Sequence, residues 1–497
     1  MTDIILIQPK GSPIRKLTCL PLGLLSISRF LAKEGYNIKI INQVINDKWE
    51  SDLQSELKKN IICVGVTAMI GDSIRGGIIA SKFVKENGNI PVIWGGPHPS
   101  ILPVQTLKED YIDIVCEGEG DITFYELVKT LEKNKPLDKV RGIWYKENKK
   151  IKKTEKRPQA DLNKLPEIPY DIIDMSKYYT TTWYKEKNFT INVETSRGCP
   201  FHCTYCYNPN LYSNWRDLKP EKVIELLKTL KDTYKVRSFH FQDDNFFVNQ
   251  KRTNKIMKSI IKEKLDIIMG FQGLRLDAAC RMEKNELDLM FDAGTKYFNI
   301  GLETGSPRIL KMIKKGTSID QAYNFNKILT NYPDVYPHYN FMAGFPTETK
   351  EEMFMTVNMM ARLIRENPNV QIISLYLFIP WPKTDIYDLS IKEGLIPPDS
   401  LKEWINIRWG LDVDDEASRF NPWLDKEFIE LYKRILLTIH TASKTNVSKI
   451  SNFFVRNLTN IYAPIAKFRF YNSCFGFMPE YVISKKITRL AKVLAGY

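Results

Sequence analysis

The chain has 497 residues, an ordinary hydrophobic content of 43% and a net charge of +14. That length predicts two or three domains, each able to bury its own core. Eight cysteines in a chain of this size exclude a disulfide-dense secreted scaffold and favour a reducing cytoplasm. The first residues, Met1–Ile7, lack the features of a secretion signal, and no apolar run reaches the roughly 18 residues of a membrane-spanning helix.

Residues 1–135 alternate between short apolar runs and amphipathic segments. Strands are expected at 4–7, 37–41, 61–67, 91–95 and 112–116, and helices at 22–33 and 72–87. Buried strands that alternate with helices form parallel sheets. The region is therefore predicted to be a doubly wound, Rossmann-like (flavodoxin-like) α/β domain, with ligands at the carboxyl ends of its strands.

Residues 136–188 are predicted to connect this domain to the next. A small hairpin is expected at 140–154, around Glu147-Asn148-Lys149, and the stretch 157–170 is proline-rich and polar, which is typical of a linker.

The strand expected at Phe189–Val193 is followed by a dense cysteine motif. Cys199, Cys203 and Cys206 follow a C-x3-C-x2-C spacing. Three thiolates can hold three irons of a [4Fe–4S] cluster, which leaves the fourth iron open to a substrate or cofactor. The alternative is a zinc site, which needs four nitrogen or sulfur ligands.

With the aromatic Tyr205 before its last cysteine, the motif resembles the signature of the radical S-adenosylmethionine (SAM) superfamily. The resemblance implies that the open iron binds SAM and that reduction of the cluster cleaves SAM to a 5′-deoxyadenosyl radical. It also implies that residues 189–385 form a partial (β/α)6 barrel of the TIM type, and that Tyr205 borders the SAM site.

Four further residues of this region are candidate SAM contacts. Asp243 or Asp244 would bind the SAM amino group, in place of the superfamily's Gly-Gly-Glu loop, although the pair could also cap a helix. Arg275 could pair with the SAM carboxylate or with Asp277. Glu303 lies in Gly-Leu-Glu-Thr-Gly-Ser, which resembles the family's G-x-E-S-G-S element at a strand end.

Residues 1–135 in turn resemble the cobalamin-binding domain that precedes the radical SAM domain in one branch of the superfamily. The candidate cobalamin contacts are Gly65, Thr67, Gly95, Gly96, His98, Glu117 and Gly118. Because no D-x-H-x-x-G motif occurs, the resemblance implies cobalamin without a histidine ligand to cobalt. Two alternatives stay open: His98 could cap backbone groups, and the domain could keep the fold without the cofactor.

Residues 386–497 are predicted to be helical and basic. Trp404, Trp409 and Trp423 could belong to a cap on the barrel or to a wall of the substrate pocket. From Lys444 onward, nine Lys and Arg residues and one acid, Glu480, are interleaved with aromatic residues. This pattern suits an anionic membrane surface, as well as a solvated face over a core. No nucleic-acid partner is expected.

Together these features predict a cytoplasmic enzyme of a low-oxygen cell. For its basic C-terminus, peripheral contact with the inner membrane face and a solvated face over a core both stay open. The enzyme would use a [4Fe–4S] cluster, SAM and methylcobalamin to methylate an unactivated carbon of a small-molecule or lipid-like substrate, with flavodoxin or ferredoxin as electron donor. The alternatives are a radical cyclase, oxidase or carbon–carbon coupling enzyme without methyl transfer, and a cobalamin or cluster sensor without turnover.

Overall fold

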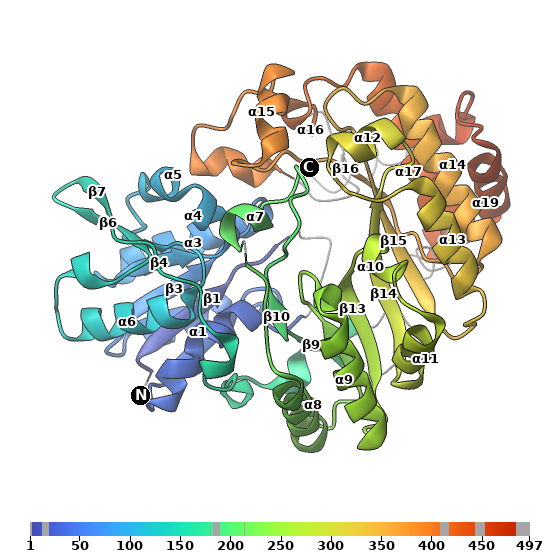
Figure 1. The fold of residues 1–497 in the computed structure, drawn as a ribbon. Coiled ribbons are helices and arrows are strands. Elements are labelled where there is room, and N and C mark those ends of the chain that lie inside the picture. Colours follow the sequence, from blue (N-terminus) through green and yellow to red (C-terminus); the bar gives the residue numbers. More distant parts are fainter. Residues whose placement is uncertain are drawn as a thin grey trace.

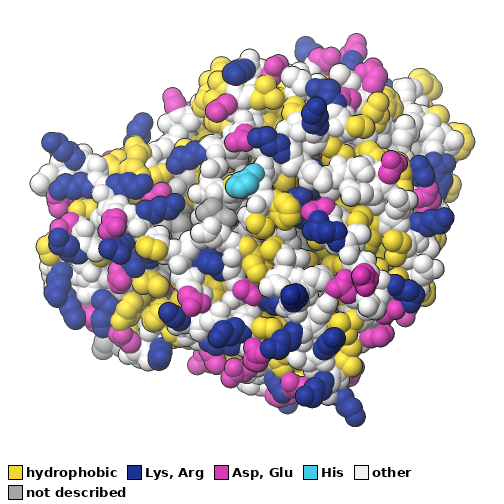
Figure 2. All heavy atoms as spheres, viewed as in Figure 1, with side chains coloured by type: hydrophobic (Ala, Val, Ile, Leu, Met, Phe, Trp, Pro, Cys, Tyr) yellow, Lys and Arg dark blue, Asp and Glu magenta, His cyan; other side chains and the backbone are white. Residues whose placement is uncertain are grey.

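The computed structural model describes residues 2–11, 19–178, 180–181, 189–212, 214–407, 417–442 and 453–483. Two seven-stranded sheets lie side by side, the first in blue and cyan and the second in green and yellow (Figure 1). The dark red helix near the C-terminus lies beside the second sheet, whereas the orange segment that precedes it lies across the top of the view. In a space-filling view, acidic and basic side chains are interspersed over this face of the molecule (Figure 2).

The first sheet has the strand order β2-β1-β3-β4-β5-β6-β7, and β1 to β5 are parallel. Its strands are β1 (Ile4–Gln8), β2 (Ile38–Asn42), β3 (Cys63–Thr67), β4 (Val92–Gly95), β5 (Ile114–Cys116), β6 (Ile143–Glu147) and β7 (Lys150–Lys153). Its helices are α1 (Leu22–Lys33), α2 (Trp49–Leu57), α3 (Asp72–Asn87), α4 (Pro97–Ile101), α5 (Pro103–Leu107) and α6 (Gly120–Glu132). The order 2-1-3-4-5 confirms the predicted doubly wound domain, and it puts a crevice at the carboxyl ends of the strands.

The core of this domain follows directly from its apolar strands. Ile4, Ile5, Leu6 and Ile7 of β1 have no exposed surface, because helices cover both faces of the sheet. The hairpin of β6 and β7 extends the same sheet, antiparallel to β5.

The second sheet has the order β16-β15-β14-β13-β12-β9-β8, in which β9 and β12 to β16 are parallel. Its strands are β8 (Thr180–Thr181), β9 (Phe189–Val193), β12 (Ser238–Phe241), β13 (Ile268–Leu274), β14 (Thr295–Glu303), β15 (Tyr336–Ala343) and β16 (Leu375–Leu377). Its helices are α8 (Pro220–Tyr234), α9 (Gln250–Lys262), α10 (Leu276–Ala279), α11 (Lys284–Asp292), α12 (Pro307–Met312), α13 (Ile319–Leu329), α14 (Lys350–Glu366) and α15 (Asp385–Lys392). Six parallel strands in an unclosed sheet confirm the predicted partial barrel.

The segment between β9 and α8 faces the first domain. It contains a two-stranded antiparallel ribbon and one short helix: β10 (Ser196–Arg197), β11 (Arg216–Asp217) and α7 (Asn208–Leu211). The three cysteines of the motif lie in the loop between β10 and α7, two elements that lie between the two sheets in Figure 1.

The C-terminal region contacts both domains. Its helices are α16 (Ala417–Phe420), α17 (Lys426–Ala442) and α19 (Phe453–Asn472), and α19 packs on α17 and α14. Trp404, in a short helix at Leu401–Asn406, instead lies in the core of the first domain, whereas Trp423 donates a hydrogen bond to the Gly344 carbonyl after β15. Trp409 lies outside the described residues. None of the described helices is both long and apolar enough to span a membrane.

Candidate cofactor sites between the two sheets

A cavity of about 290 Å³ lies between the carboxyl ends of the first sheet and the segment after β9. Five of the seven predicted cobalamin contacts line it: Gly65, Thr67, Gly95, Gly96 and Gly118. The opposite wall comes from the second domain, through Tyr207, Asn208, Tyr212 and Asp244 among others. The topology thus brings the first domain's strand-end loops against the residues that follow the cysteine motif.

The glycines give this cavity an open backbone wall. A Cβ added at Gly118, which has a φ of +81°, would meet no atom within 4 Å, and one at Gly95 would meet only the Cys116 Cβ at 3.9 Å. A ligand can therefore lie directly against these main-chain atoms. Bare backbone at Gly95 and Gly118 lets a large, flat cofactor such as cobalamin approach this wall closely.

The other two predicted cobalamin contacts lie outside the lining of the cavity. The Glu117 carboxylate accepts a hydrogen bond from Trp144 Nε1 at 2.7 Å and pairs with Lys153 at 3.2 Å. His98 is 1% exposed, lies edge-on to Trp404 with ring centroids 5.7 Å apart, and has no described partner for either ring nitrogen. The alternative prediction, that the His98 side chain caps backbone groups, is not supported either, because neither ring nitrogen forms a described hydrogen bond.

The cysteine loop carries a donor set that fits an iron–sulfur cluster. Burial raises the pKa of Cys206 to about 12 and that of Cys199 above its ordinary value, so thiolates here need a compensating cation such as iron. The Arg275 guanidinium donates to Cys203 Sγ at 3.4 Å. Among the described residues, no group of three or more His, Cys, Asp or Glu side chains lies close enough together to hold a single metal ion.

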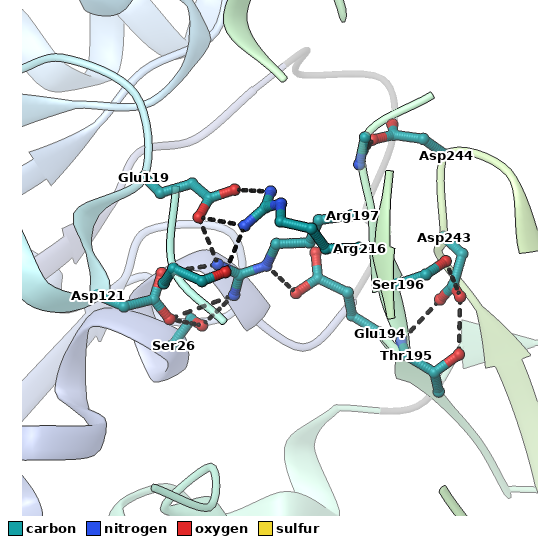
Figure 3. Close-up of polar contacts among 12 residues, drawn as sticks. Ser26, Glu119, Asp121, Glu194, Thr195, Ser196, Arg197, Arg216, Asp243 and Asp244 are labelled. Carbon is teal, nitrogen blue, oxygen red and sulfur yellow. Dashed lines mark hydrogen bonds and ion pairs between the residues drawn. The ribbon is translucent and has the colours of Figure 1, made fainter. Parts of the chain in front are cut away.

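The two neighbouring aspartates have different surroundings (Figure 3). Asp243 is 1% exposed and accepts hydrogen bonds from Thr195 N (2.8 Å), Thr195 Oγ1 (2.7 Å) and Ser196 Oγ (2.6 Å). Burial outweighs these hydrogen bonds and raises its pKa to about 6. Asp244 is an exposed residue that lines the cavity, and its carboxylate accepts a hydrogen bond from Gly198 N at 3.0 Å. Partial burial of this carboxylate raises its pKa above the ordinary value as well. Asp243 therefore fixes the chain ahead of the cysteines, whereas Asp244 stays accessible to a ligand.

Arg275 already has a carboxylate partner in this structure. Its Nε lies 2.8 Å from Asp277 Oδ1, and its Nη2 donates to the Lys315 carbonyl at 2.6 Å. The guanidinium also stacks over the Phe201 ring, 3.6 Å from the ring centroid. The arginine is thus held beside Cys203 by contacts that leave its orientation fixed.

Glu303 and Tyr205, both predicted SAM contacts, meet a third residue that the sequence did not single out. Lys315 Nζ lies 2.6 Å from Glu303 Oε1 and 3.1 Å from the Tyr205 hydroxyl, which donates to the same carboxylate at 2.9 Å. Burial, followed by the Glu303 charge, raises the pKa of Tyr205 well above its usual value, so the phenol keeps its proton. Lys315 ends the run Lys311–Lys315, which is typical of a solvated face and gave no signal of burial.

Comparison with known proteins places the chain in a family. The model of the radical SAM superfamily matches residues 193–360, and that of the B12 binding domain matches residues 15–128. A protein of Pyrococcus horikoshii called an uncharacterized methyltransferase is 29% identical over 90% of this chain and 95% of its own. An anaerobic magnesium-protoporphyrin IX monomethyl ester cyclase of Synechocystis is 26% identical, over 86% of this chain and 83% of the cyclase.

A solved structure shares the whole arrangement. The radical SAM methyltransferase TsrM of Kitasatospora setae, with cobalamin and a [4Fe-4S] cluster bound, matches with a TM-score of 0.67 at 14% identity, over 94% of this chain and 100% of TsrM. The B12-binding match spans β2 to β5 of the first sheet, and the radical SAM match spans β12 to β15 of the second. The chain belongs to the radical SAM enzymes that carry a B12-binding domain, whose cofactors are a [4Fe–4S] cluster, SAM and cobalamin.

Proposed function

We propose that this enzyme is a cobalamin-dependent C-methyltransferase. The observation that carries the proposal is the shared lining of the cavity, by Gly95 and Gly118 of the B12-binding domain and by Tyr207 and Asp244 next to the cysteine loop. When bound, the cluster would supply an electron to SAM and cobalamin would carry the methyl group. The chain's own residues bind these groups, orient them and exclude water.

The geometry supports a division of roles among the predicted site residues. Cys199, Cys203 and Cys206 are the proposed cluster ligands. Asp244 lines the cavity with a carboxylate that can accept hydrogen bonds, which suits the SAM amino group, and Arg275 beside Cys203 suits the SAM carboxylate. Asp243, enclosed by Thr195 and Ser196, is proposed to position the loop instead of touching SAM, and Glu303 with Tyr205 and Lys315 to form the neighbouring wall of the SAM site.

The runner-up function is radical cyclisation without methyl transfer. The similarity to a magnesium-protoporphyrin ester cyclase over 86% of this chain favours it. Both functions use the same radical step, and a fold does not by itself decide between them. They differ in the fate of SAM, because only cobalamin methylation releases S-adenosylhomocysteine.

The products of SAM therefore test the proposal. The protein would be purified anaerobically from cells supplied with hydroxocobalamin and incubated with SAM and a low-potential electron donor of the flavodoxin or ferredoxin class. We expect about one corrin per chain, 5′-deoxyadenosine and S-adenosylhomocysteine. Cys203→Ala should abolish 5′-deoxyadenosine, whereas Cys280→Ala, a cysteine outside the motif, should not. Corrin-free protein that still forms 5′-deoxyadenosine would favour the cyclase, and wild-type protein without that product would contradict both.

We further propose that this cytoplasmic enzyme meets a lipid-like substrate at an anionic membrane surface. Ile461, Ile465 and Phe468 lie on one face of α19 and are 74%, 53% and 63% exposed, and Phe477 is 84% exposed. The only acid from Lys444 onward, Glu480, is paired with Arg469 at 2.6 Å, which leaves this region strongly cationic. Exposed apolar groups in a stretch whose sequence is this basic match a bilayer that contains acidic lipids.

Vesicle binding tests this surface. The protein should sediment with vesicles that contain phosphatidylglycerol, less with pure phosphatidylcholine, and less at high salt. A triple variant, Ile461→Ser with Phe468→Ser and Phe477→Ser, should lose most of this binding. Ile396→Ser serves as the control, because Ile396 is equally exposed at 74% but lies in another part of the chain. Equal binding by the triple variant and the wild type would contradict the proposal.

A further inference from the structure

A buried ion pair joins the cysteine loop to the B12-binding domain (Figure 3). Arg197 of β10 lies two residues before the first cysteine of the motif. Its Nη1 lies 2.7 Å from Asp121 Oδ2 and its Nη2 lies 3.2 Å from Asp121 Oδ1, so two parallel hydrogen bonds form a fork. Nη2 also donates to Ser26 Oγ at 2.7 Å. Asp121 stands in the first turn of α6 and Ser26 in α1, so all of these partners belong to the first domain.

Charges on either side keep the arginine in place. Arg197 Nε donates to Glu194 Oε2 at 2.7 Å, within its own domain. Arg216, its neighbour across the β10–β11 ribbon, forms an ion pair with Glu119 and donates to the Ala160 carbonyl at 2.8 Å. Glu119 is the residue ahead of α6. The contact between domains thus consists of two ion pairs, Arg197 with Asp121 and Arg216 with Glu119. They are connected, because Arg197 Nη1 also lies 3.6 Å from Glu119 Oε2.

The ion pair between Arg197 and Asp121 is buried. Arg197 is 9% exposed and Asp121 is 3% exposed. Burial by itself would raise the pKa of Asp121, but Arg197 and then Arg29 outweigh it and lower the pKa to about 2, so the carboxylate is charged at neutral pH. Buried ion pairs add little net stability compared with well-packed apolar side chains. The planar fork does fix the distance and orientation between its two partners.

The same residues form walls of the cavity. Ser26, Glu119 and Asp121 line it from the first domain, and Glu194 and Arg197 line it from the second. A ligand in the cavity would therefore lie next to both partners of the ion pair, Arg197 and Asp121. Arg197 is continuous through Gly198 with Cys199, and the Gly198 amide is held by Asp244. The residue whose guanidinium contacts the first domain is thus separated from the first cysteine by Gly198 alone.

We propose that Arg197 is a positioning residue that couples occupancy of the cobalamin cavity to the geometry of the cluster-binding loop. This inference rests on the proposed function, which puts cobalamin in the cavity and a cluster on the three cysteines. Coupling between two binding sites is reciprocal. Bound cobalamin should therefore stabilise the cluster, and the Arg197–Asp121 pair should be required for that stabilisation.

The test measures how fast a chelator removes iron from the reconstituted protein, with and without bound hydroxocobalamin. In the wild type we expect hydroxocobalamin to slow iron loss by about fivefold or more. Asp121→Asn keeps the shape but removes the charge, so it should bind iron normally, lose this protection and bind hydroxocobalamin about tenfold more weakly. Arg197→Lys keeps the charge without the fork and should retain part of the protection.

Two further variants keep the test decisive. Glu126→Gln lies on the same helix and breaks an ion pair with Arg157 that does not involve the barrel, so it should retain full protection. Ser26→Ala removes the hydroxyl that donates to Asp121 and accepts from Arg197. It should reduce the protection against iron loss, and it serves as the test if Asp121→Asn does not fold. Full protection in Asp121→Asn, or wild-type protein that binds hydroxocobalamin without slower iron loss, would overturn the coupling. Wild-type protein that binds no hydroxocobalamin would instead overturn the proposed function.

Discussion

The Lys315 ammonium is 6% exposed and lies between Glu303 and the Tyr205 hydroxyl. Space for this pair exists because residue 301 is glycine: a Cβ there would lie 2.1 Å from Glu303 Oε1 and 2.9 Å from Lys315 Nζ. Glu303 itself has a φ of +69°, an uncommon backbone conformation for a residue other than glycine. Single residues of this kind carry large energetic consequences, because water cannot replace a buried partner.

Lys315→Met should destabilise the protein. It leaves the Glu303 carboxylate buried without its cation, which costs about 3–5 kcal/mol of unfolding free energy. Urea unfolding under anaerobic conditions measures the loss. The neighbouring Lys314→Met is the matched control, because that side chain is 64% exposed and its ion pair with Asp385 is on the surface. An equal effect in both variants would contradict the assigned burial of Lys315.

His98 should make the stability depend on pH. Burial lowers its pKa to about 3, whereas an unfolded histidine has a pKa of about 6.5. Between these values the unfolded chain binds a proton that the folded chain does not, so stability falls as pH drops through the window. The loss between about pH 7 and about pH 5 amounts to about 2 kcal/mol. Urea unfolding of the wild type should show this extra loss relative to His98→Leu; equal losses would contradict it.

At the scale of elements, the chain ahead of the cysteines is held from several sides. Asp243, after β12, binds Thr195 and Ser196, and Arg252 of α9 donates to the Thr195 carbonyl at 3.0 Å. Gly198 has a φ of +82°, and a Cβ there would lie 2.5 Å from the Asn214 carbonyl oxygen. The turn into the cysteine loop is therefore shaped by the elements around it as well as by its own sequence.

Gly198→Ala should impair cluster binding. The alanine needs a left-handed conformation that costs about 1–2 kcal/mol, and its Cβ meets backbone that cannot move freely. We expect less than half of the wild-type iron and acid-labile sulfide per chain after anaerobic reconstitution. Gly476→Ala is the control, because its added Cβ meets nothing within 4 Å. Normal iron content in Gly198→Ala would contradict the proposed strain.

Some helices and strands could be predicted from local sequence patterns, and others could not. The apolar run at Ile4–Ile7 predicted β1 to within a residue, because a strand buried on both faces has a distinctive composition. Helix α2 was missed, since only Leu53 and Leu57 of it are buried and the rest is polar. The hairpin was predicted correctly as a hairpin, but its pairing with β5 depends on a strand distant in sequence.

On the scale of the whole molecule, the C-terminal region holds the two domains together. Trp404 is 1% exposed, donates from Nε1 to Gln105 Oε1 at 2.7 Å and packs against His98. Its own carbonyl accepts from Gly71 N at 3.2 Å. The domain boundaries at 135, 188 and 385 stay predictions. Part of the segment after residue 385, which includes Trp404, packs on the first domain.

Trp404→Ala should therefore destabilise the first domain. A deleted buried tryptophan costs about 3–5 kcal/mol, because the cavity that it leaves closes only in part. Urea unfolding gives the loss, and hydrogen exchange should show it in α3 and α5, which contact the helix at Leu401–Asn406. Trp404→Phe should recover part of the stability by refilling the space. Unchanged exchange in α3 and α5 would contradict the contact.

The sequence by itself determined the order of the parallel strands in the first domain, the cysteine motif and, through its resemblance, the family of cofactors. Those features depend on residue spacing within a few turns or strands, where periodicity and motif spacing are direct signals. Only the tertiary structure decided that Asp244 and not Asp243 faces the cavity, that His98 faces Trp404, and that Arg197 reaches Asp121. The hydrogen bonds of Asp243 with Thr195, of Trp404 with Gln105 and of Arg197 with Asp121 join residues 48, 299 and 76 positions apart, and no local pattern specifies which distant side chains meet.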